Sequence, residues 1–321
     1  MYLKNKKVLF IAPHFYDYHL SIKNELESNG ASVDYYEERP NTIKYKIYKK
    51  LSKKLKSMEE KKYFDNILNN IKTEYDIFYL IRGEVISKSF LEKLKNRLPK
   101  AKFVMYQWDS VQNNNYIDKI HFFDKVFTFD MIDAKKYKIN YLPLFYTKEY
   151  ENLQHNKIKQ YDIVFVGYYH SDRLNIVKKM ANYSNDNNLK FKYHIYLDKL
   201  VLLKFILQGN ILFSDLKYIS TKSLSKNNII DLYKDTKAVL DIQHNMQNGL
   251  TMRTMEVLGS GLKLITTNQN IKNEDFYDEN NICLIDRVEI VIKKAFFNKL
   301  IIGNLSQYRL FNWLWNVSNV S

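Results

Sequence analysis

Residues 238–267 read AVLDIQHNMQNGLTMRTMEVLGSGLKLITT, and this stretch decides the fold. An apolar strand ends near Ile242, a polar loop follows, a helix begins near Leu250 or Thr251, and a second apolar strand begins at Leu262. The first N–H groups of a helix lack partners within the helix, and the helix dipole favours anions there. We therefore expect a parallel α/β unit with an anion site at the start of this helix.

Side chains around the start of that helix suit a diphosphate and a ribose. Gly249 lets an anion approach the backbone, Thr251 offers a hydroxyl, and Arg253 is able to hold a phosphate through two donors. Glu256 lies on the same helix face as Arg253, where a carboxylate is placed to accept hydrogen bonds from a ribose diol. The other candidates in this segment are His244, Gln247 and Leu250. An ordinary strand–helix connection with a surface Arg–Glu pair explains the segment equally well.

The alternation of strands and helices runs along the whole chain and restarts once. Val8–Pro13 opens a first series of buried strands, and Asp162–Gly167 opens a second series after a polar stretch. We predict an α/β protein with two tandem Rossmann-like domains facing a cleft. The expected parts are an N-terminal acceptor-binding domain over 1–150, a C-terminal nucleotide-sugar-binding domain over 160–305, and a last helix over 306–321 that must dock on the protein, with a return to the N-terminal domain as one option.

The run from Gly249 to Thr266 resembles the donor-site motif of GT-B glycosyltransferases, in which an Arg and a Glu on a helix precede a small-residue turn and an apolar strand. The likeness covers nearly the whole chain, from the Rossmann-like start at Val8, through Gly167 at the end of the second domain's first strand, to a tryptophan-bearing C-terminal helix. It is closest to transferases of bacterial capsule, O-antigen and lipopolysaccharide-core assembly.

This resemblance implies a nucleotide-sugar donor and a glycan or lipid-linked acceptor. It implies that Glu256 binds the nucleotide ribose, that Arg253 and Thr251 face the diphosphate, and that Gly167 lies at the donor site. The longer two-glutamate motif of retaining enzymes would place a Glu near 247–250, where this chain has none. Retention or inversion of the sugar's configuration therefore stays open.

Loops at the carboxyl ends of the N-terminal strands are expected to hold the acceptor, and one of their side chains is expected to take its proton. The candidate bases are Asp109, Glu84 and His14, and the candidate acceptor contacts are Tyr16, Arg82, Gln107 and Trp108. Some of them have a plainer alternative. Asp109 suits an N-cap, Trp108 suits the core and His14 suits a local loop bond. Arg82 either pairs with Glu84 or holds an anionic part of a ligand.

Apolar residues recur at helical spacing through residues 43–62, and lysines crowd the remaining positions. This pattern predicts one basic amphipathic helix, suited to the surface of an anionic membrane. The alternative is a helix whose apolar stripe packs on its own domain. The stripe and the lysines are Ile43, Ile47, Leu51, Leu55 and Met58, with Lys46, Lys49, Lys50, Lys53, Lys54 and Lys56.

Composition narrows the remaining classes. The formal charge of +15 favours an anionic partner, but no nucleic-acid-binding module is visible, so we expect no nucleic acid. We find no secretory signal, and the apolar stretch Val201–Leu212 is too short to span a bilayer, so a cytoplasmic protein, peripheral at the inner membrane face, is expected. The single Cys283 makes a disulfide framework or a cysteine-rich metal site impossible.

Cofactor enzymes are disfavoured because the first strand–helix loop has no glycine before Gly30 and no P-loop occurs. We therefore expect no cofactor. A clear Asp-x-Asp pair is missing too, and Arg253 with the helix start is placed to neutralise a leaving diphosphate, so we expect metal-independent transfer. The rival from another class is a two-lobed α/β protein that binds a nucleotide or sugar without catalysis.

Overall fold

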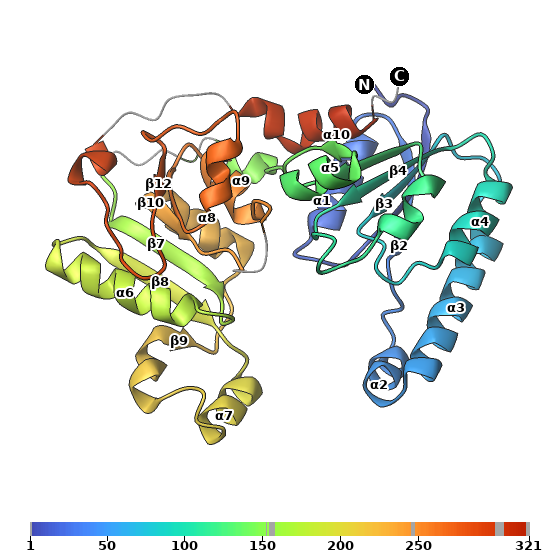
Figure 1. The fold of residues 1–321 in the computed structure, drawn as a ribbon. Helices are drawn as coiled ribbons and strands as arrows, with labels where there is room; N and C mark the ends of the chain where they lie inside the picture. Colours follow the sequence, from blue (N-terminus) through green and yellow to red (C-terminus); the bar gives the residue numbers. More distant parts are fainter. Residues whose placement is uncertain (1, 152, 154–157, 245–247, 299–304, 319–321) are drawn as a thin grey trace. The chain divides into compact units, whose positions relative to one another are not determined.

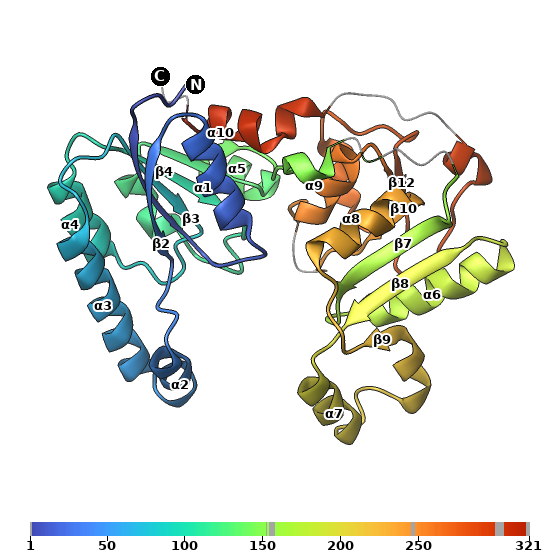
Figure 2. The same cartoon turned by 180° about the vertical axis from the view of Figure 1, so that it is seen from behind.

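The computed structural model divides the chain into two compact units. The described residues are 2–151, 153, 158–244, 248–298 and 305–318. The first unit is Met1–Leu144 with Leu310–Ser321, and the second is Phe145–Arg309. Each unit is built on a six-stranded sheet whose neighbouring strands run parallel, with helices packed against it (Figures 1 and 2). The prediction of two tandem parallel α/β domains is confirmed.

The sheet of the first unit has the strand order β2-β1-β3-β4-β5-β6. Its strands are β1 (Lys7–Ala12), β2 (Ser32–Glu37), β3 (Ile77–Ile81), β4 (Lys102–Gln107), β5 (Lys125–Thr128) and β6 (Asn140–Tyr141). Val8 pairs with Val33 on β2 and with Ile77 on β3, which places β1 inside the sheet. All of β3 is buried, as expected for a strand covered on both faces.

Helices cover both faces of this sheet. The helices of this unit are α1 (Tyr18–Ser28), α2 (Ile43–Leu51), α3 (Lys53–Asn70), α4 (Lys88–Arg97), α5 (Met131–Tyr137) and α10 (Leu310–Ser318), with the 3-10 helix η1 (Ile117–Phe122). Successive residues of β1 point to opposite faces. Leu9 shares one core with Phe64 of α3 and Leu91 of α4, whereas Phe10 lies near Ile22 of α1 and Trp313 of α10.

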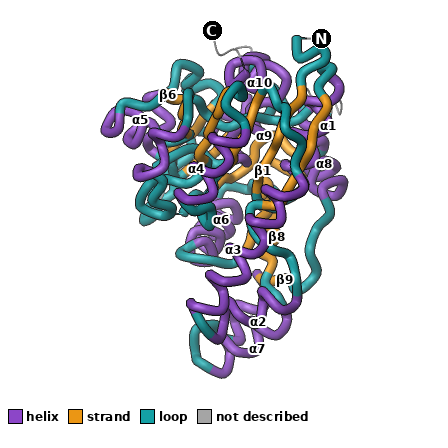
Figure 3. The backbone as a smooth tube through the Cα atoms, turned by 90° about the vertical axis from the view of Figure 1, so that its right-hand side faces the viewer, coloured by secondary structure: helices purple, strands orange, loops and turns teal. Residues whose placement is uncertain are grey.

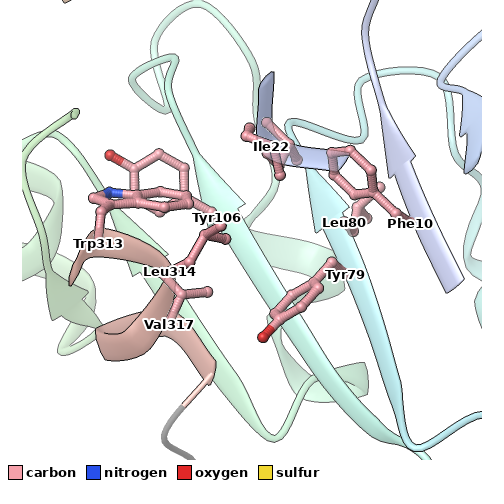
Figure 4. Close-up of a pocket in the computed structure, with 9 residues that line it drawn as sticks. Phe10, Ile22, Tyr79, Leu80, Tyr106, Trp313, Leu314 and Val317 are labelled. Atoms are coloured by element: carbon pink, nitrogen blue, oxygen red, sulfur yellow. The ribbon is translucent and has the colours of Figure 1, made fainter. Parts of the chain in front are cut away.

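The C-terminal helix α10 belongs to the first unit. Its Trp313 is fully buried, donates its indole N–H to the Pro143 carbonyl at 3.0 Å, and packs edge-on against Tyr106 at 4.6 Å between ring centroids. Trp313, Leu314 and Val317 line a small apolar pocket against the sheet (Figure 4). Burial of this apolar helix face therefore completes a core that begins at the other end of the sequence.

The second unit repeats the plan with the strand order β12-β11-β10-β7-β8-β9. Its strands are β7 (Tyr161–Tyr168), β8 (Phe191–Tyr196), β9 (Ile219–Ser220), β10 (Thr236–Asp241), β11 (Lys263–Thr266) and β12 (Ile282–Leu284). Its helices are α6 (Arg173–Asp186), α7 (Lys199–Leu207), α8 (Lys226–Lys234) and α9 (Met252–Gly259), with 3-10 helices η2 (Lys148–Tyr150), η3 (Phe213–Tyr218), η4 (Gln269–Asn273), η5 (Lys294–Asn298) and η6 (Ser306–Tyr308). Ala238 of β10 pairs with Lys263 of β11, which places the carboxyl ends of both strands beside the start of α9.

The predicted single helix over residues 43–62 is wrong. Ser52 adopts an extended conformation, ends α2, and caps α3 by accepting a hydrogen bond from the Leu55 N–H at 3.4 Å. The alternative in which the stripe packs on its own domain is wrong as well, because Ile43 is 79% and Leu51 is 73% exposed. Figure 3 shows α3 running away from the strands, with α2 at its far end.

Among the described residues, no helix combines the length and apolar content needed to cross a bilayer.

Candidate functional site

Charged side chains gather at the carboxyl edge of the first unit's sheet. Parallel strands end on the same edge, so residues that are distant in sequence meet there. Glu38 and Arg39 follow β2, Arg82 and Glu84 follow β3, and Asp109 follows β4.

The turn after β3 is held in a strained conformation by buried polar groups. Arg82 has φ 69° and Gly83 has φ 68°, and the left-handed region is costly for a residue such as Arg82. Gln107 and Asn114 donate to the Arg82 carbonyl at 2.6 and 3.2 Å, and Lys119 donates to the Gly83 carbonyl at 2.8 Å. Gln107 is fully buried, so in this structure its amide supports the turn.

Arg82 joins two of the three candidate bases. Its Nε lies 2.8 Å from Asp109 Oδ2, and its Nη2 contacts Glu84 Oε2. Arg39 Nη2 approaches the same Glu84 oxygen at 2.9 Å. The pairing of Arg82 with Glu84 that was one of its two predicted roles is present, and Asp109 is a partner that the sequence did not indicate.

The N-cap alternative for Asp109 is wrong. The chain after β4 forms a bend and a turn, and the next helical segment, η1, begins only at Ile117. An N-cap side chain must sit directly before a helix to accept from its first N–H groups, so Asp109 has no helix to cap.

Glu38 is a member of this cluster that sequence reasoning missed. It is fully buried, and its Oε1 accepts from the Glu84 N–H at 2.6 Å. Arg39 Nη2 lies 3.7 Å from Oε1, and Arg82 Nη1 lies 3.9 Å from Oε2. A buried carboxylate between two guanidinium groups orients both of them. The only sequence signal was an acidic pair directly after the second strand.

The three carboxyl groups have different proton affinities. Burial raises the pKa of Asp109 despite the opposing attraction of Arg82, and burial likewise raises the pKa of Glu38. Burial acts on Glu84 in the same direction, but attraction to Arg82 and the bond from Arg39 outweigh it and lower its pKa. A base with a raised pKa binds a proton more strongly, so Asp109 is better suited than Glu84 to accept one.

His14, the third candidate base, lies in a different set of contacts. Its Nδ1 is 3.7 Å from Glu37 Oε1, and its ring lies 4.6 Å from that of His19. His19 is buried and stacks on Tyr35, and burial together with His14 lowers its pKa. His14 thus contacts His19 of α1 and Glu37 at the end of β2.

Exposed aromatic side chains flank this edge of the sheet. Phe15 is 45% and Tyr16 is 53% exposed, and the Phe15 ring lies 5.9 Å from Trp108, which is half-buried and not part of the core. Tyr16 and Asp17 both have positive φ, at 44° and 62°. A loop that stores strain to expose aromatic faces suits contact with a sugar ring.

In the second unit, the start of α9 is capped from within the protein. The Thr251 hydroxyl accepts from the Thr254 N–H at 3.1 Å and donates to Asp241 Oδ2 at 2.7 Å. Thr254 donates to the same oxygen at 2.7 Å. These bonds fix the helix start against the end of β10.

The loop before α9 is also anchored. Asn268 donates to the Gly249 carbonyl at 3.1 Å, and Leu250 is buried, so its side chain serves packing. His244 is half-buried at the end of β10. Gln247, another donor-site candidate, lies outside the described residues.

Arg253 and Glu256 lie in a tyrosine-lined polar cluster. Arg253 donates to the Tyr233 hydroxyl at 2.9 Å, Tyr233 is fully buried, and Glu256 is only 4% exposed. Tyr150 is 3% exposed, and burial and the neighbouring Glu256 raise its pKa. The alternative of an ordinary surface Arg–Glu pair is therefore wrong.

Two histidines and an arginine meet at the carboxyl ends of β7 and β10. His170 stacks on His244 at 5.4 Å, and burial together with Arg173 and His244 lowers the pKa of His170 to about 4. Arg173 donates to the Ile242 and Tyr168 carbonyls at 3.0 and 3.2 Å. A Cβ on Gly167 would lie 2.9 Å from the Phe165 ring and 3.4 Å from Arg173 Nη1, so a glycine here makes room for this packing.

Sequence reasoning missed His170, Arg173 and a second arginine, Arg287. Arg287 pairs with both oxygens of Asp172 at 2.7 and 2.8 Å and donates to the Gln243 carbonyl at 3.0 Å. The available signal was that His170 and Arg173 follow within a few residues of Gly167, at the end of the unit's first strand. Arg287 had no such signal, because only the fold brings β12 to this edge.

Within the described part of the chain, no group of three or more His, Cys, Asp or Glu side chains is arranged to hold a metal ion.

Comparison with known proteins gives a clear answer on the fold. No protein-family model matches the chain, and no curated protein matches its sequence. Solved structures match over nearly its full length. The apo lipopolysaccharide outer core galactosyltransferase WaaB is 12% identical with a TM-score of 0.55, covering 98% of both chains. A glycosyltransferase from Rickettsia africae ESF-5 is 12% identical with a TM-score of 0.61, covering 99% of this chain and all of the other.

The UDP-GlcNAc 2-epimerase of Methanocaldococcus jannaschii, solved with UDP-GlcNAc and UDP, is also 12% identical, with a TM-score of 0.56 over 98% of this chain and all of its own. The chain therefore has the GT-B fold, with one Rossmann-like domain in each unit. Glycosyltransferases have this fold, and so does an epimerase of nucleotide sugars. The fold alone therefore does not distinguish these activities.

Proposed function

We propose that this protein is a glycosyltransferase that moves a sugar from a nucleotide-sugar donor to a hydroxyl of a glycan or lipid-linked glycan in bacterial surface-polysaccharide assembly. The GT-B fold supports a nucleotide-sugar ligand. The observation that carries the proposal is the position of Asp109, a carboxylate with a raised pKa that follows β4 of the first unit and lies against Arg82. Such a group suits the removal of a proton from an attacking hydroxyl.

The donor is proposed to bind the second unit at the carboxyl edge of its sheet. The start of α9, with Arg173, His170 and His244 at the adjacent strand ends, forms an environment that attracts a diphosphate. Glu256 is proposed to hold the ribose diol, which would replace the Tyr150 hydroxyl as its neighbour. Gly249 and Gly167 are proposed to keep the backbone accessible, and Arg253 to stabilise the leaving diphosphate.

The acceptor is proposed to bind the first unit. Tyr16, Phe15 and Trp108 offer aromatic surface for a sugar ring, while Arg82 orients the base. The test is a panel of UDP-, GDP-, dTDP- and CMP-sugars measured first for thermal stabilisation and then for transfer to glycan acceptors. Donor-dependent stabilisation with no transfer to any acceptor would favour a binding protein without catalysis.

Epimerisation of a nucleotide sugar is the second candidate, because an enzyme of that kind matches this chain at full length. The two reactions differ in their need for an acceptor. Inversion of UDP-GlcNAc at C2 without any acceptor, followed by NMR, would replace the transferase proposal.

Residues of α2 and α3 are proposed to attach the protein to an anionic membrane at its cytoplasmic face. Exposed Ile43, Ile47 and Leu51 of α2, with Leu55 and Met58 of α3, lie among lysines, which suits a lipid surface. Replacing the six lysines by Gln should weaken binding to vesicles that contain phosphatidylglycerol. Unchanged sedimentation with those vesicles would remove this attachment. The lysines are Lys46, Lys49, Lys50, Lys53, Lys54 and Lys56.

A further inference from the structure

Helix α7 of the second unit is apolar without being buried. Its sequence, KLVLLKFIL, contains seven apolar residues and two lysines, and none of its nine residues is buried. A helix that is apolar on every face normally lies inside a protein or against lipid. Figures 1 and 2 show α7 at the end of the second unit away from α9.

The two faces of α7 have different neighbours. Leu202, Phe205 and Ile206 are half-buried, and the Phe205 ring lies 5.8 Å from Tyr169 in its own unit. The outer residues follow the helical spacing i, i+3, i+7 and are large. They are Leu200, 77% exposed, Leu203, 55% exposed, and Leu207, 80% exposed. The inner face already attaches the helix to its unit, so the outer leucines have no packing role there.

The apolar surface continues beyond the helix. Gly209, at φ 70°, turns the chain, and η3 then presents Leu212, 61% exposed, and Phe213, 79% exposed. Asp215 holds this turn by accepting from the Leu212 N–H at 3.3 Å and from Lys178 Nζ at 2.6 Å. A part-buried ion pair between Asp215 and Lys178 thus holds the turn that carries the exposed leucine and phenylalanine.

The charges around this surface favour an anionic partner. Lys199, Lys204 and Lys217 are exposed. The two acidic residues of the stretch are engaged within the protein, Asp198 as the N-cap of α7, accepting from the Leu200 N–H at 2.9 Å, and Asp215 in its ion pair. Exposed leucine and phenylalanine beside lysine match the boundary between anionic headgroups and acyl chains.

We propose that the α7–η3 surface, made of Leu200, Leu203, Leu207, Leu212 and Phe213, inserts into the boundary between headgroups and acyl chains of an anionic phospholipid membrane. A second copy of the chain fits less well. A standard protein interface takes about 20–30 residues from each partner, far more than these five side chains, whereas a lipid surface needs no matching shape. The proposal concerns the second unit, goes beyond the glycosyl transfer proposed above, and does not depend on it.

The test is co-sedimentation of the full chain with phosphatidylcholine vesicles, with and without phosphatidylglycerol, in the absence of nucleotide. Leu200→Ser with Leu207→Ser should weaken partition by about tenfold or more. The matched control is Val288→Ser with Val291→Ser, which removes two apolar side chains of similar exposure, 78% and 62%, from the same unit and should change little. Lys199→Gln with Lys204→Gln should weaken binding only where phosphatidylglycerol is present.

A depth measurement gives an independent readout. A tryptophan introduced by Phe213→Trp should be quenched by lipid brominated on its acyl chains. The proposal is overturned if the leucine variant, folded by circular dichroism, binds vesicles like the control, or if the Phe213→Trp fluorescence is not quenched. It is overturned as well if the leucine substitutions convert a dimer to a monomer while vesicle binding is unchanged. Donor stabilisation and transfer, measured without lipid, test the glycosyltransferase proposal separately.

Discussion

The side chain of Arg82 lies 2.8 Å, Nε to Oδ2, from the carboxylate of Asp109, across two adjacent strands of the first unit. The same guanidinium contacts Glu84, and the backbone that carries it is held at positive φ by Gln107 and Lys119. Because this arginine is held firmly, it fixes the orientation of the Asp109 carboxylate. A group that accepts a proton requires such a fixed orientation.

Asp109→Asn should lower kcat by about 10²–10⁴-fold with little change in donor KM, since the amide keeps the shape but cannot take a proton. The matched control is Glu84→Gln, which changes the other carboxylate that contacts Arg82. It should lower kcat less, because the pKa of Glu84 is lowered and its carboxylate is a weaker base. The base must be ionised, so wild-type kcat/KM should fall as the pH drops through the raised pKa of Asp109, above the usual aspartate range. Full activity of the asparagine variant would reject Asp109 as the base.

Glu256→Ala should abolish thermal stabilisation by the correct nucleotide sugar, because the ribose loses its acceptor. Tyr150→Phe is the companion variant. It removes only the hydroxyl next to Glu256 and should preserve the stabilisation. The shifts are measured against each variant's own melting temperature, which corrects for the loss of a buried group. A shift that survives in Glu256→Ala would mean that the ribose binds elsewhere.

Gly259→Ala should destabilise the second unit by about 1–3 kcal/mol, because overpacking forces neighbouring groups apart. A Cβ at this position would lie 2.4–2.6 Å from the Tyr146 ring atoms. Gly209→Ala separates sterics from backbone strain. That site is open but has φ 70°, so only a backbone cost of about 1–2 kcal/mol applies. Urea unfolding of both variants measures the loss in the free energy of unfolding. In a chain that already carries Tyr146→Ala, the Gly259→Ala substitution should cost less, because the ring that the new Cβ would meet is absent.

Transfer should continue in EDTA, because Arg253 and the start of α9 are proposed to neutralise the leaving diphosphate. Turnover is measured before and after chelation. Activity that disappears with EDTA and returns with Mg²⁺ or Mn²⁺ would show that a cation performs this task.

Local patterns in the sequence were enough to predict helix α9. The apolar run before it, the polar Asn-Gly loop and the glycines after it placed a helix over Thr251–Leu258, and α9 spans Met252–Gly259. Strand, cap and helix lie next to one another in sequence, so periodicity and capping rules apply directly.

Features set by distant contacts could not be predicted in the same way. Glu38 gains its importance because β2 and β3 flank β1, which brings it beside Arg82, and no local pattern contains that neighbour. The stretch Val201–Leu212 was recognised only as apolar and too short to span a bilayer. Helix α7 within it was not predicted, because a segment that is apolar on nearly every face shows no helical periodicity. The break at Ser52 was hidden because the apolar spacing continues across it from α2 into α3.

The return of α10 to the first unit has a consequence for how the protein is made. Ribosomes emit a chain from its N-terminus at about 5–20 residues per second, so the residues of the second unit delay α10 by on the order of ten seconds or more. During that time Tyr106 and Phe10 lack the cover that Trp313 and Leu314 provide. The first unit to be synthesised therefore becomes the last to be completed, and a nascent chain stalled before Leu310 would present its apolar sheet face to chaperones.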